Sequence, residues 1–169
     1  PPEDVDPYRL AKAIKIMLTG DYPDYPKENR LEMATGILHR FDLEEIEPAA
    51  LCRYADRLED HLRQSFSFEK EKRKIALRHF RMEQLFETVA DRLLIGPEEV
   101  VLLQNSGFSG SEAQLKNQAM KLAPWCYYAG EALRAQYPDK KVRTLIHFVL
   151  AGCLLEVRTS VSRPAVENP

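Results

Sequence analysis

The residues that most clearly suggest a chemistry are cations in the middle of the chain. Four of them are spaced four, four and three residues apart, which would put them on one face of a helix: Lys70, Lys74, Arg78 and Arg81. Such a face would be about 16 Å long, enough to meet two or three successive phosphates of a nucleic-acid backbone. Three nearby cations could widen it: Arg63, Lys72 and Arg73. The spacing therefore predicts a basic, phosphate-binding surface.

A second, smaller cluster of cations lies later in the sequence, at Lys140, Lys141 and Arg143. They stand at the predicted start of a helix, where the helix dipole disfavours positive charge, and this placement indicates a use other than stability. No zinc module, helix-turn-helix or aromatic-bearing sheet motif that reads bases is recognisable in the sequence. We therefore expect contacts with the nucleic-acid backbone that are independent of base sequence and sensitive to salt.

Sequence motifs for catalysis and for metal binding are missing. The four histidines are far apart, and none has a His or Glu at a spacing typical of a helical metal site: His39, His61, His79 and His147. The segment 107–111 contains glycine and serine, but it has neither the spacing of a nucleophile turn nor a Walker-type lysine. We predict a non-catalytic protein with no metal, no cofactor and no small-molecule substrate.

The charge of the chain is unevenly distributed, although its net value is only −2 over 169 residues. Residues 1–60 hold eight basic and fourteen acidic residues, whereas residues 61–82 hold seven basic and two acidic residues. A chain polarised in this way can present a basic surface despite an ordinary isoelectric point. The alternative interpretation is that these charges only solvate the outer face of a helix.

Length, cysteine content and hydropathy indicate one soluble domain. With 44% hydrophobic and 30% charged residues, the composition is that of an ordinary globular protein. Cys52, Cys126 and Cys153 are widely spaced and predict free thiols in a reducing compartment. The longest apolar run, residues 145–155, is too short to span a bilayer. We expect a cytoplasmic protein without membrane contact.

The segment 67–94 carries the first group of cations and is predicted to be one long helix. Alternate steps of four and three residues give a mostly apolar seam along it: Phe68, Lys72, Ile75, His79, Met82, Phe86, Val89 and Leu93. Two polar residues interrupt this seam, which suits the core of a bundle with a polar margin better than a long coiled coil.

Helix signals cover most of the remaining chain. Asp6-Pro7 and Glu47-Pro48 are typical helix starts, and Ser111 with Gln114 forms a capping box. Apolar stripes predict helices at about 7–19, 28–40, 48–65, 98–104, 111–137 and 139–157, the last of them apolar nearly all round. No run alternates with period two for long enough to predict a strand. The predicted fold is all-α: a bundle of about six or seven helices organised around the long helix.

The predicted single helical domain spans residues 1–169 and includes a flexible loop and a polar tail. Residues 105–111, rich in glycine and serine, are predicted to form a flexible loop, and residues 158–169 a polar tail. The chain begins with Pro1-Pro2 and no methionine. Processing, trimming or excision from a longer polypeptide would each explain that beginning.

Two stretches bear a family resemblance, DPYRLAKAIKIML and RLEDHLRQSFSFEKEKRKIALRHFRMEQLFETVADRLL. With the all-helical layout and the missing methionine, they make the chain similar to the small helical subunits of CRISPR Cascade-type effector complexes. The nearest likeness is to the type I-D small subunit, which is produced as the C-terminal part of the large subunit. This resemblance covers nearly the whole chain.

The resemblance implies a non-catalytic subunit of an antiviral ribonucleoprotein, present in more than one copy. It would contact the backbone of the guide RNA and target DNA, or the displaced strand, through the cations named above. The acidic first third departs from a uniformly basic small subunit. That departure suggests that the acidic surface meets basic neighbouring subunits, including further copies of the same chain.

A different class of function fits the same residues. In this alternative the protein is a helical adaptor or assembly factor whose partner is protein alone. The basic stripe would then dock on an acidic surface, and the apolar final helix would pair with another chain. Binding to a nucleic acid of arbitrary sequence at low salt separates the two hypotheses.

Overall fold

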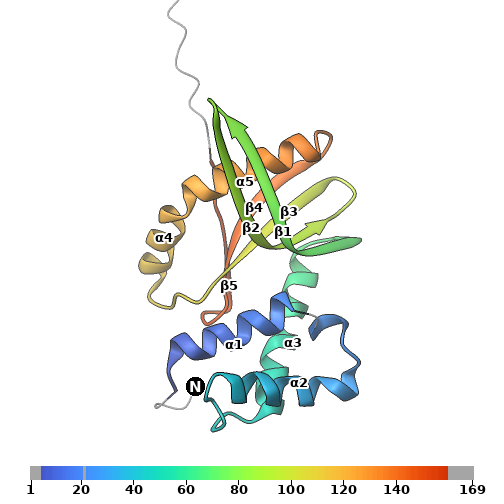
Figure 1. Ribbon diagram of the computed structural model, residues 1–169, viewed down its shortest axis with the longest axis vertical. Helices are drawn as coiled ribbons and strands as arrows, with labels where there is room; N and C mark the ends of the chain where they lie inside the picture. The colour runs from blue at the N-terminus through green and yellow to red at the C-terminus, as the bar shows by residue number, and fades with distance from the viewer. Residues whose placement is uncertain (1–4, 21, 160–169) are drawn as a thin grey trace, which may run out of the picture.

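The fold is a mixed α/β arrangement of five α-helices and a five-stranded sheet (Figure 1). The computed structural model describes residues 5–20 and 22–159, to which these counts refer. The predicted all-α helical bundle is wrong, because three segments predicted as helices are strands. The predicted tail lies, from residue 160 onward, outside the described residues. Within the described part of the chain, no helix is long and apolar enough to cross a membrane.

The first third of the chain is helical, as predicted. Its elements are α1 (Pro7–Thr19), the short 3-10 helix η1 (Tyr22–Asp24), α2 (Lys27–Arg40) and α3 (Pro48–Ser65). Helix α1 begins as its sequence indicates, because the side chain of Asp6 accepts a hydrogen bond from the backbone N–H of Tyr8 at 2.9 Å. We call α1, η1, α2 and α3 together the helical lobe.

The predicted long helix over residues 67–94 is wrong, because most of this segment forms a β-hairpin. Strands β1 (Lys70–Arg81) and β2 (Gln84–Ile95) pair antiparallel from end to end, with one interruption at Lys74. Only Met82 and Glu83 connect them, and both have left-handed backbones, with φ of 49° and 64°, as a type I′ turn requires. We call this hairpin the arm. Figure 1 shows its turn at the end farthest from the helical lobe.

The arm continues into a mixed sheet whose strands lie side by side in sequence order. Strand β3 (Glu99–Ser106) is antiparallel to β2, and β4 (Lys141–Phe148) is parallel to β3. The crossover between β3 and β4 contains α4 (Glu112–Lys121), which begins with the predicted capping box, and α5 (Ala123–Gln136). Strand β5 (Cys153–Glu156) returns antiparallel to β4. Strands β1 and β5 are therefore the edges of the sheet.

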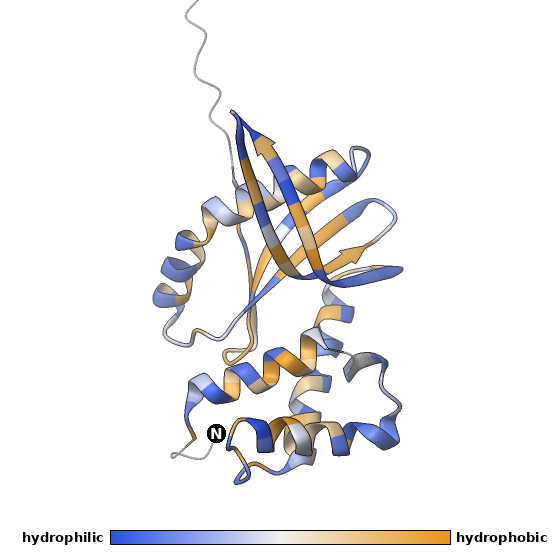
Figure 2. Ribbon diagram, in the orientation of Figure 1, coloured by the Kyte–Doolittle hydropathy of each residue, from blue (hydrophilic) through white to orange (hydrophobic). Residues whose placement is uncertain are grey.

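The predicted helices at 98–104 and 139–157 are wrong for a common reason. Most of the apolar residues in each segment belong to a central strand, β3 or β4, that is covered on both faces, so they do not alternate with polar residues. Hydropathy alone does not separate such a buried strand from a buried helix. Figure 2 shows the central strands mostly in the hydrophobic colour, whereas the arm mixes hydrophobic and hydrophilic residues.

Alternation along β3 identifies what covers each face of the sheet. Val100 and Leu102 pack against α5, whereas Val101 and Leu103 pack against the C-terminal end of α3. We call these sides the α5 face and the α3 face. The C-terminal end of α3 and the helix α5 therefore cover opposite faces of the central strands.

The strand β1 exchanges these two faces at Lys74. The side chains of Glu71 and Arg73 contact groups on the α3 face, whereas Ile75 and Leu77 pack on the α5 face, although all four are odd-numbered residues. Lys74, between them, has a left-handed φ of 50°, which interrupts the usual alternation of the strand. The odd-numbered side chains of β1 consequently face α3 before Lys74 and face α5 after it.

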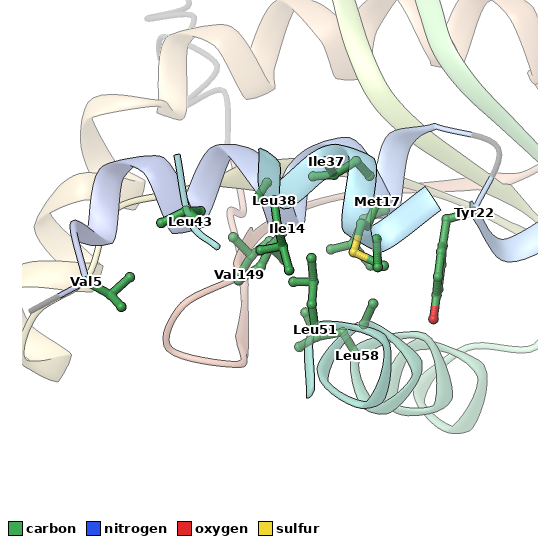
Figure 3. Packing of buried hydrophobic residues seen from close by; sticks show 14 residues of the cluster. Val5, Ile14, Met17, Tyr22, Ile37, Leu38, Leu43, Leu51, Leu58 and Val149 are labelled. Carbon is green, nitrogen blue, oxygen red and sulfur yellow. The ribbon is translucent and has the colours of Figure 1, made fainter. Parts of the chain in front are cut away.

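A single core joins the helices of the lobe and takes in a residue from near the other end of the chain. Ile14, Met17 and Leu51 are buried in this core together with Val149, from the turn after β4 (Figure 3). The hydroxyl of Tyr54 donates a hydrogen bond to the backbone carbonyl of Val149 at 2.5 Å. The lobe and the sheet are thus packed directly on each other.

The turn of the arm gives a first prediction. A left-handed backbone is costly for Met82 and Glu83, roughly 1–2 kcal/mol each, whereas Asn-Gly is a preferred pair for this turn. We expect Met82→Asn combined with Glu83→Gly to raise the free energy of unfolding by about 1 kcal/mol in urea denaturation. The control, Met82→Ala with Glu83→Ala, keeps the strained backbone and should give no increase. No gain in the Asn-Gly variant would contradict the turn geometry.

Candidate functional site

The outer edge of the sheet is formed by a strongly basic strand. Strand β1 pairs on one side only, and its sequence, KEKRKIALRHFR, contains six Lys or Arg residues and one acidic residue. Lys70, Lys72 and Lys74 are exposed along its first half. We call these three lysines the basic edge. The structure therefore brings three of the predicted phosphate-binding residues together, on a strand and not on a helix.

The side chains of Lys70 and Lys74 are free to meet a ligand. Within the described residues, neither takes part in a hydrogen bond or an ion pair. The ammonium group of Lys72 makes one contact, 3.5 Å from the hydroxyl of Tyr137 at the end of α5. Lys70 and Lys74 are separated by about 13 Å of extended chain. Exposed ammonium groups on flexible stems are suited to anions held without fixed geometry.

The other two members of the predicted stripe point to opposite sides of the arm. Arg78 faces away from α5 and pairs with Glu87 directly across the hairpin, with 2.6 Å between Nε and Oε1. Arg81 faces α5, where its Nη1 donates to the hydroxyl of Tyr127 at 2.8 Å. The prediction that four cations share one face is therefore wrong, because strand alternation replaces the helical repeat.

Arg73, which was also predicted to bind phosphate, is bound into the base of the arm. Its Nε donates to Glu71 at 2.8 Å, and its Nη1 donates to the backbone carbonyl of Gly20 at 2.8 Å and to Asp24 at 3.1 Å. These bonds join β1 to the segment between α1 and η1. Arg73 consequently serves the fold and not an external ligand.

Beside Arg73, a fully buried arginine connects the arm to α3. Arg92 forms a bidentate pair with Glu59, with Nη1 and Nη2 at 2.6 and 3.0 Å from the two carboxylate oxygens. Its Nε donates to Glu71 at 2.8 Å. No pattern in the sequence predicts this group of three residues, because a pair between a helix and a distant strand leaves no spacing signal.

The second predicted cluster lies at the same end of the sheet as Lys70. Lys140 donates to the backbone carbonyls of Gly96 and Pro97 at 2.6 and 3.0 Å. These two residues directly follow Ile95, the last residue of β2, and Ile95 pairs with Lys70. The side chain of Lys141 is exposed and has no hydrogen bond or ion pair within the described residues. The prediction that these lysines start a helix is wrong, because Lys140 lies just before strand β4 and Lys141 is its first residue.

Two predicted arginines, Arg143 and Arg63, are occupied by neighbouring side chains. Arg143 donates from Nε to Glu156 at 3.0 Å and lies 3.5 Å from Glu99. The hydrogen bond from Arg143 lowers the pKa of the Glu156 carboxyl. Arg63 lies over the ring of Phe68, 5.7 Å from its centre. Among the predicted cations, the side chains of Lys70, Lys74 and Lys141 therefore have no partner in the described part of the chain, whereas Arg73 and Arg143 are bound within the fold.

An aromatic group on the α5 face of the arm was missed by the sequence analysis. Phe86 of β2 stacks on Tyr128 of α5 with 5.2 Å between ring centres, and Tyr127 meets Tyr128 edge-on at 5.3 Å. His79 lies opposite Phe86 in the hairpin, 6.2 Å from Tyr128. A hollow of about 450 Å³ adjoins this group near the turn of the arm. Its members come from two strands and a helix, so only a prediction of the hairpin would have revealed it.

A buried polar pair lies on the α3 face. His147 Nδ1 is 3.2 Å from Asn105 Oδ1, and both side chains are buried. His147 Nε2 and Asn105 Nδ2 have no hydrogen-bond partner within the described residues. Burial, with smaller effects from the charges of Arg92 and His61, lowers the pKa of His147 to about 4. Among the described residues, no group of three or more His, Cys, Asp or Glu side chains could hold a metal ion.

Comparisons with known proteins identify no family for the chain. No protein-family model matches it, and no curated protein matches it. The resemblance to CRISPR small subunits rests in part on an all-helical layout, which the sheet contradicts. Membership in such a complex stays a prediction.

The buried histidine gives a second prediction, on pH. His147 in the unfolded chain takes up a proton near pH 6.5, whereas in the folded protein it stays neutral down to about pH 4. Protons therefore favour the unfolded state between these values, and the free energy of unfolding should fall by up to about 1.4 kcal/mol per pH unit as the pH is lowered. The stability associated with a neutral His147 is therefore fully present above pH 6.5 and is lost as the pH falls toward 4.

Urea denaturation across this range tests the assignment. We expect His147→Gln to reduce the dependence of the unfolding free energy on pH, whatever its effect on stability at neutral pH. The control is His39→Gln, because the imidazole of His39 is 82% exposed. An unchanged pH dependence in His147→Gln would contradict a depressed pKa at this position.

Proposed function

We propose that the protein binds the sugar-phosphate backbone of nucleic acid through the basic edge, without catalysis and without regard to base sequence. The observation that carries this proposal is the row of three exposed lysines on an edge strand, two of which lack an intramolecular partner in the described part of the chain. Backbone contacts of this kind depend on accessible cations more than on exact geometry.

The shape of the arm supports the proposal. The arm is a two-stranded ribbon, and ribbons of this kind enter nucleic-acid grooves. At its turn the side chain of Met82 is 83% exposed, and nearby Phe80 is 69% exposed. Exposed apolar side chains on a basic ribbon are found in architectural proteins, where they wedge between bases. The arm thus combines charge for the backbone with apolar groups that can reach the bases.

We also propose a setting for this activity. The chain would act in the cytoplasm, where its three free cysteines stay reduced, as one subunit of a larger ribonucleoprotein. Residues 1–60, most of which form the helical lobe, hold eight basic and fourteen acidic residues. An acidic lobe beside a basic edge favours contact with basic neighbouring subunits, further copies included.

A salt titration tests backbone binding. We expect the protein to bind a fluorescent single strand of arbitrary sequence at low salt, measured by anisotropy. The double variant Lys70→Gln, Lys74→Gln should bind about tenfold more weakly, because two phosphate contacts are lost. Its plot of log affinity against log salt should be shallower by about 0.7 per lysine. Gln is chosen because it removes the charge and keeps a polar edge.

The matched control removes two exposed lysines of α1 and α4, by Lys12→Gln with Lys121→Gln. This variant has the same net charge as the test variant and should bind as the parent does. Absence of binding at the lowest salt would refute the proposal. Equal weakening by both double variants would show that only the net charge matters.

A second candidate function rests on a separate observation, the uncovered side of the arm. Beyond Lys74, the side turned away from α5 exposes Phe80, Leu85 and Val89 around the Arg78–Glu87 pair. The cation and the anion make this surface complementary to itself under two-fold rotation. We propose that a second copy of the chain covers it in a weak dimer. This candidate keeps the predicted role in assembly, but on a strand surface and not on a helix.

Sedimentation velocity over a range of concentrations tests the second candidate. We expect a concentration-dependent dimer, and we expect Phe80→Asn with Leu85→Asn to give a monomer because the apolar contact is lost. Met120→Asn removes an equally exposed apolar side chain from α4 and should leave the dimer intact. A parent protein that stays monomeric at the highest concentration would exclude this function.

A further inference from the structure

The hollow beside the turn of the arm has walls of unusual chemistry for a surface depression. Its volume is about 450 Å³, and Leu85 lines it beside three aromatic rings, an arginine, an amide and a methionine: His79, Phe86, Tyr128, Arg81, Gln84 and Met82. These side chains come from both strands of the arm, from its turn and from α5. The hollow therefore exists only because the arm lies against α5.

The aromatic rings provide flat apolar surfaces. Phe86 and Tyr128 are stacked, with an angle of 28° between their planes, and His79 is tilted at 40° to Tyr128. Phe86, Tyr128 and His79 are only partly buried. A planar ligand could therefore extend the existing stack.

Polar groups stand at the rim of the same hollow. Arg81 and Gln84 form the last pair of the hairpin and are both exposed. The guanidinium of Arg81 donates to the hydroxyl of Tyr127 at 2.8 Å, which holds it near the rings. Arginine offers five donors in a plane, and glutamine offers both a donor and an acceptor. Flat apolar walls with such a rim are suited to a planar, heteroatom-rich ring.

The basic edge and the hollow open toward the same side of the sheet. Because the strand changes face at Lys74, Lys72 approaches Tyr137, just after α5, and His79 approaches Tyr128 of α5, although one residue number is even and the other odd. Five residues of extended chain separate Lys74 from His79, about 17 Å. A few nucleotides of an extended single strand would cover that distance.

We propose that this hollow receives one unpaired nucleobase of a single strand whose phosphates follow the basic edge. The inference rests on the proposed function and sharpens it from nucleic acid in general to a single strand. Stacking on aromatic side chains accepts any base, since every base has a π face, and therefore needs no sequence preference. A base inside a duplex is already stacked and paired and does not enter such a hollow.

The experiment uses the full chain and a single strand with 2-aminopurine at one central position. Stacking quenches the fluorescence of this base, so we expect quenching when the parent protein binds. Tyr128→Leu should remove the quenching and weaken single-strand binding about tenfold, while the slope against salt stays unchanged. Tyr128→Phe keeps the ring and should behave as the parent. If Tyr128→Leu does not fold, Phe86→Leu is measured with the same expectations.

The matched control is Tyr8→Leu, which removes an exposed aromatic ring from α1, in the helical lobe and away from the arm. It should retain both the quenching and the affinity. The parent should bind a strand that lacks its bases about tenfold more weakly than an intact strand. Tyr128→Leu should bind this strand without bases as tightly as the parent does. Agreement of these results supports a base in the hollow.

Failure of this inference differs from failure of the proposed function. Suppose that the strand binds and that Lys70→Gln with Lys74→Gln weakens this binding. If 2-aminopurine is then not quenched, or is quenched by Tyr128→Leu as strongly as by the parent, the hollow takes no base. Binding of the backbone by the basic edge would still stand. If Tyr128→Leu leaves strand binding intact and abolishes self-association, the hollow is a protein contact. If no strand binds at low salt, both proposals fall.

Discussion

The buried pair of Glu59 and Arg92 is the constraint on which the arrangement depends. Arg92 is fully buried, and a guanidinium without its carboxylate there would cost about 3–5 kcal/mol. Glu59 belongs to α3 and Arg92 to β2, so the pair sets the position of the helical lobe relative to the sheet. Glu71 extends the pair to β1. A shift of the helical lobe would therefore move the side chains at the base of the arm.

Because the base of the arm is held in place, the basic edge and the hollow keep fixed positions relative to α5. Below Lys74 the strand β1 turns ionic side chains toward the lobe, and above it the same strand turns aromatic and apolar side chains toward α5. One left-handed residue thus lets a single strand serve two unrelated sets of partners. The lysines remain on the outer edge, and within the described residues the side chains of Lys70 and Lys74 bind neither set.

The sequence predicts the helical lobe well and the sheet poorly, for identifiable reasons. Helix α1 has a capping residue and an apolar stripe, both of which are local signals. The arm lacks the usual turn residues, because its type I′ turn is Met82-Glu83 and not Asn-Gly, and its charges happen to recur at a helical spacing. Of the site, the lysines could be found from the sequence. The partners of Arg73 and the rings beside Tyr128 could not, since they come from elements distant in sequence.

The lysines of the basic edge have a further consequence, which concerns solubility. An uncovered edge strand of twelve residues offers its free backbone groups to any other extended chain, and such edges promote aggregation. Three ammonium groups in a row repel a second copy of the same edge and make edge-to-edge pairing unfavourable. Strand β5, the other edge, has only four residues. Whatever the protein binds, its longest edge is protected from polymerising with itself by the same charges that would attract a polyanion.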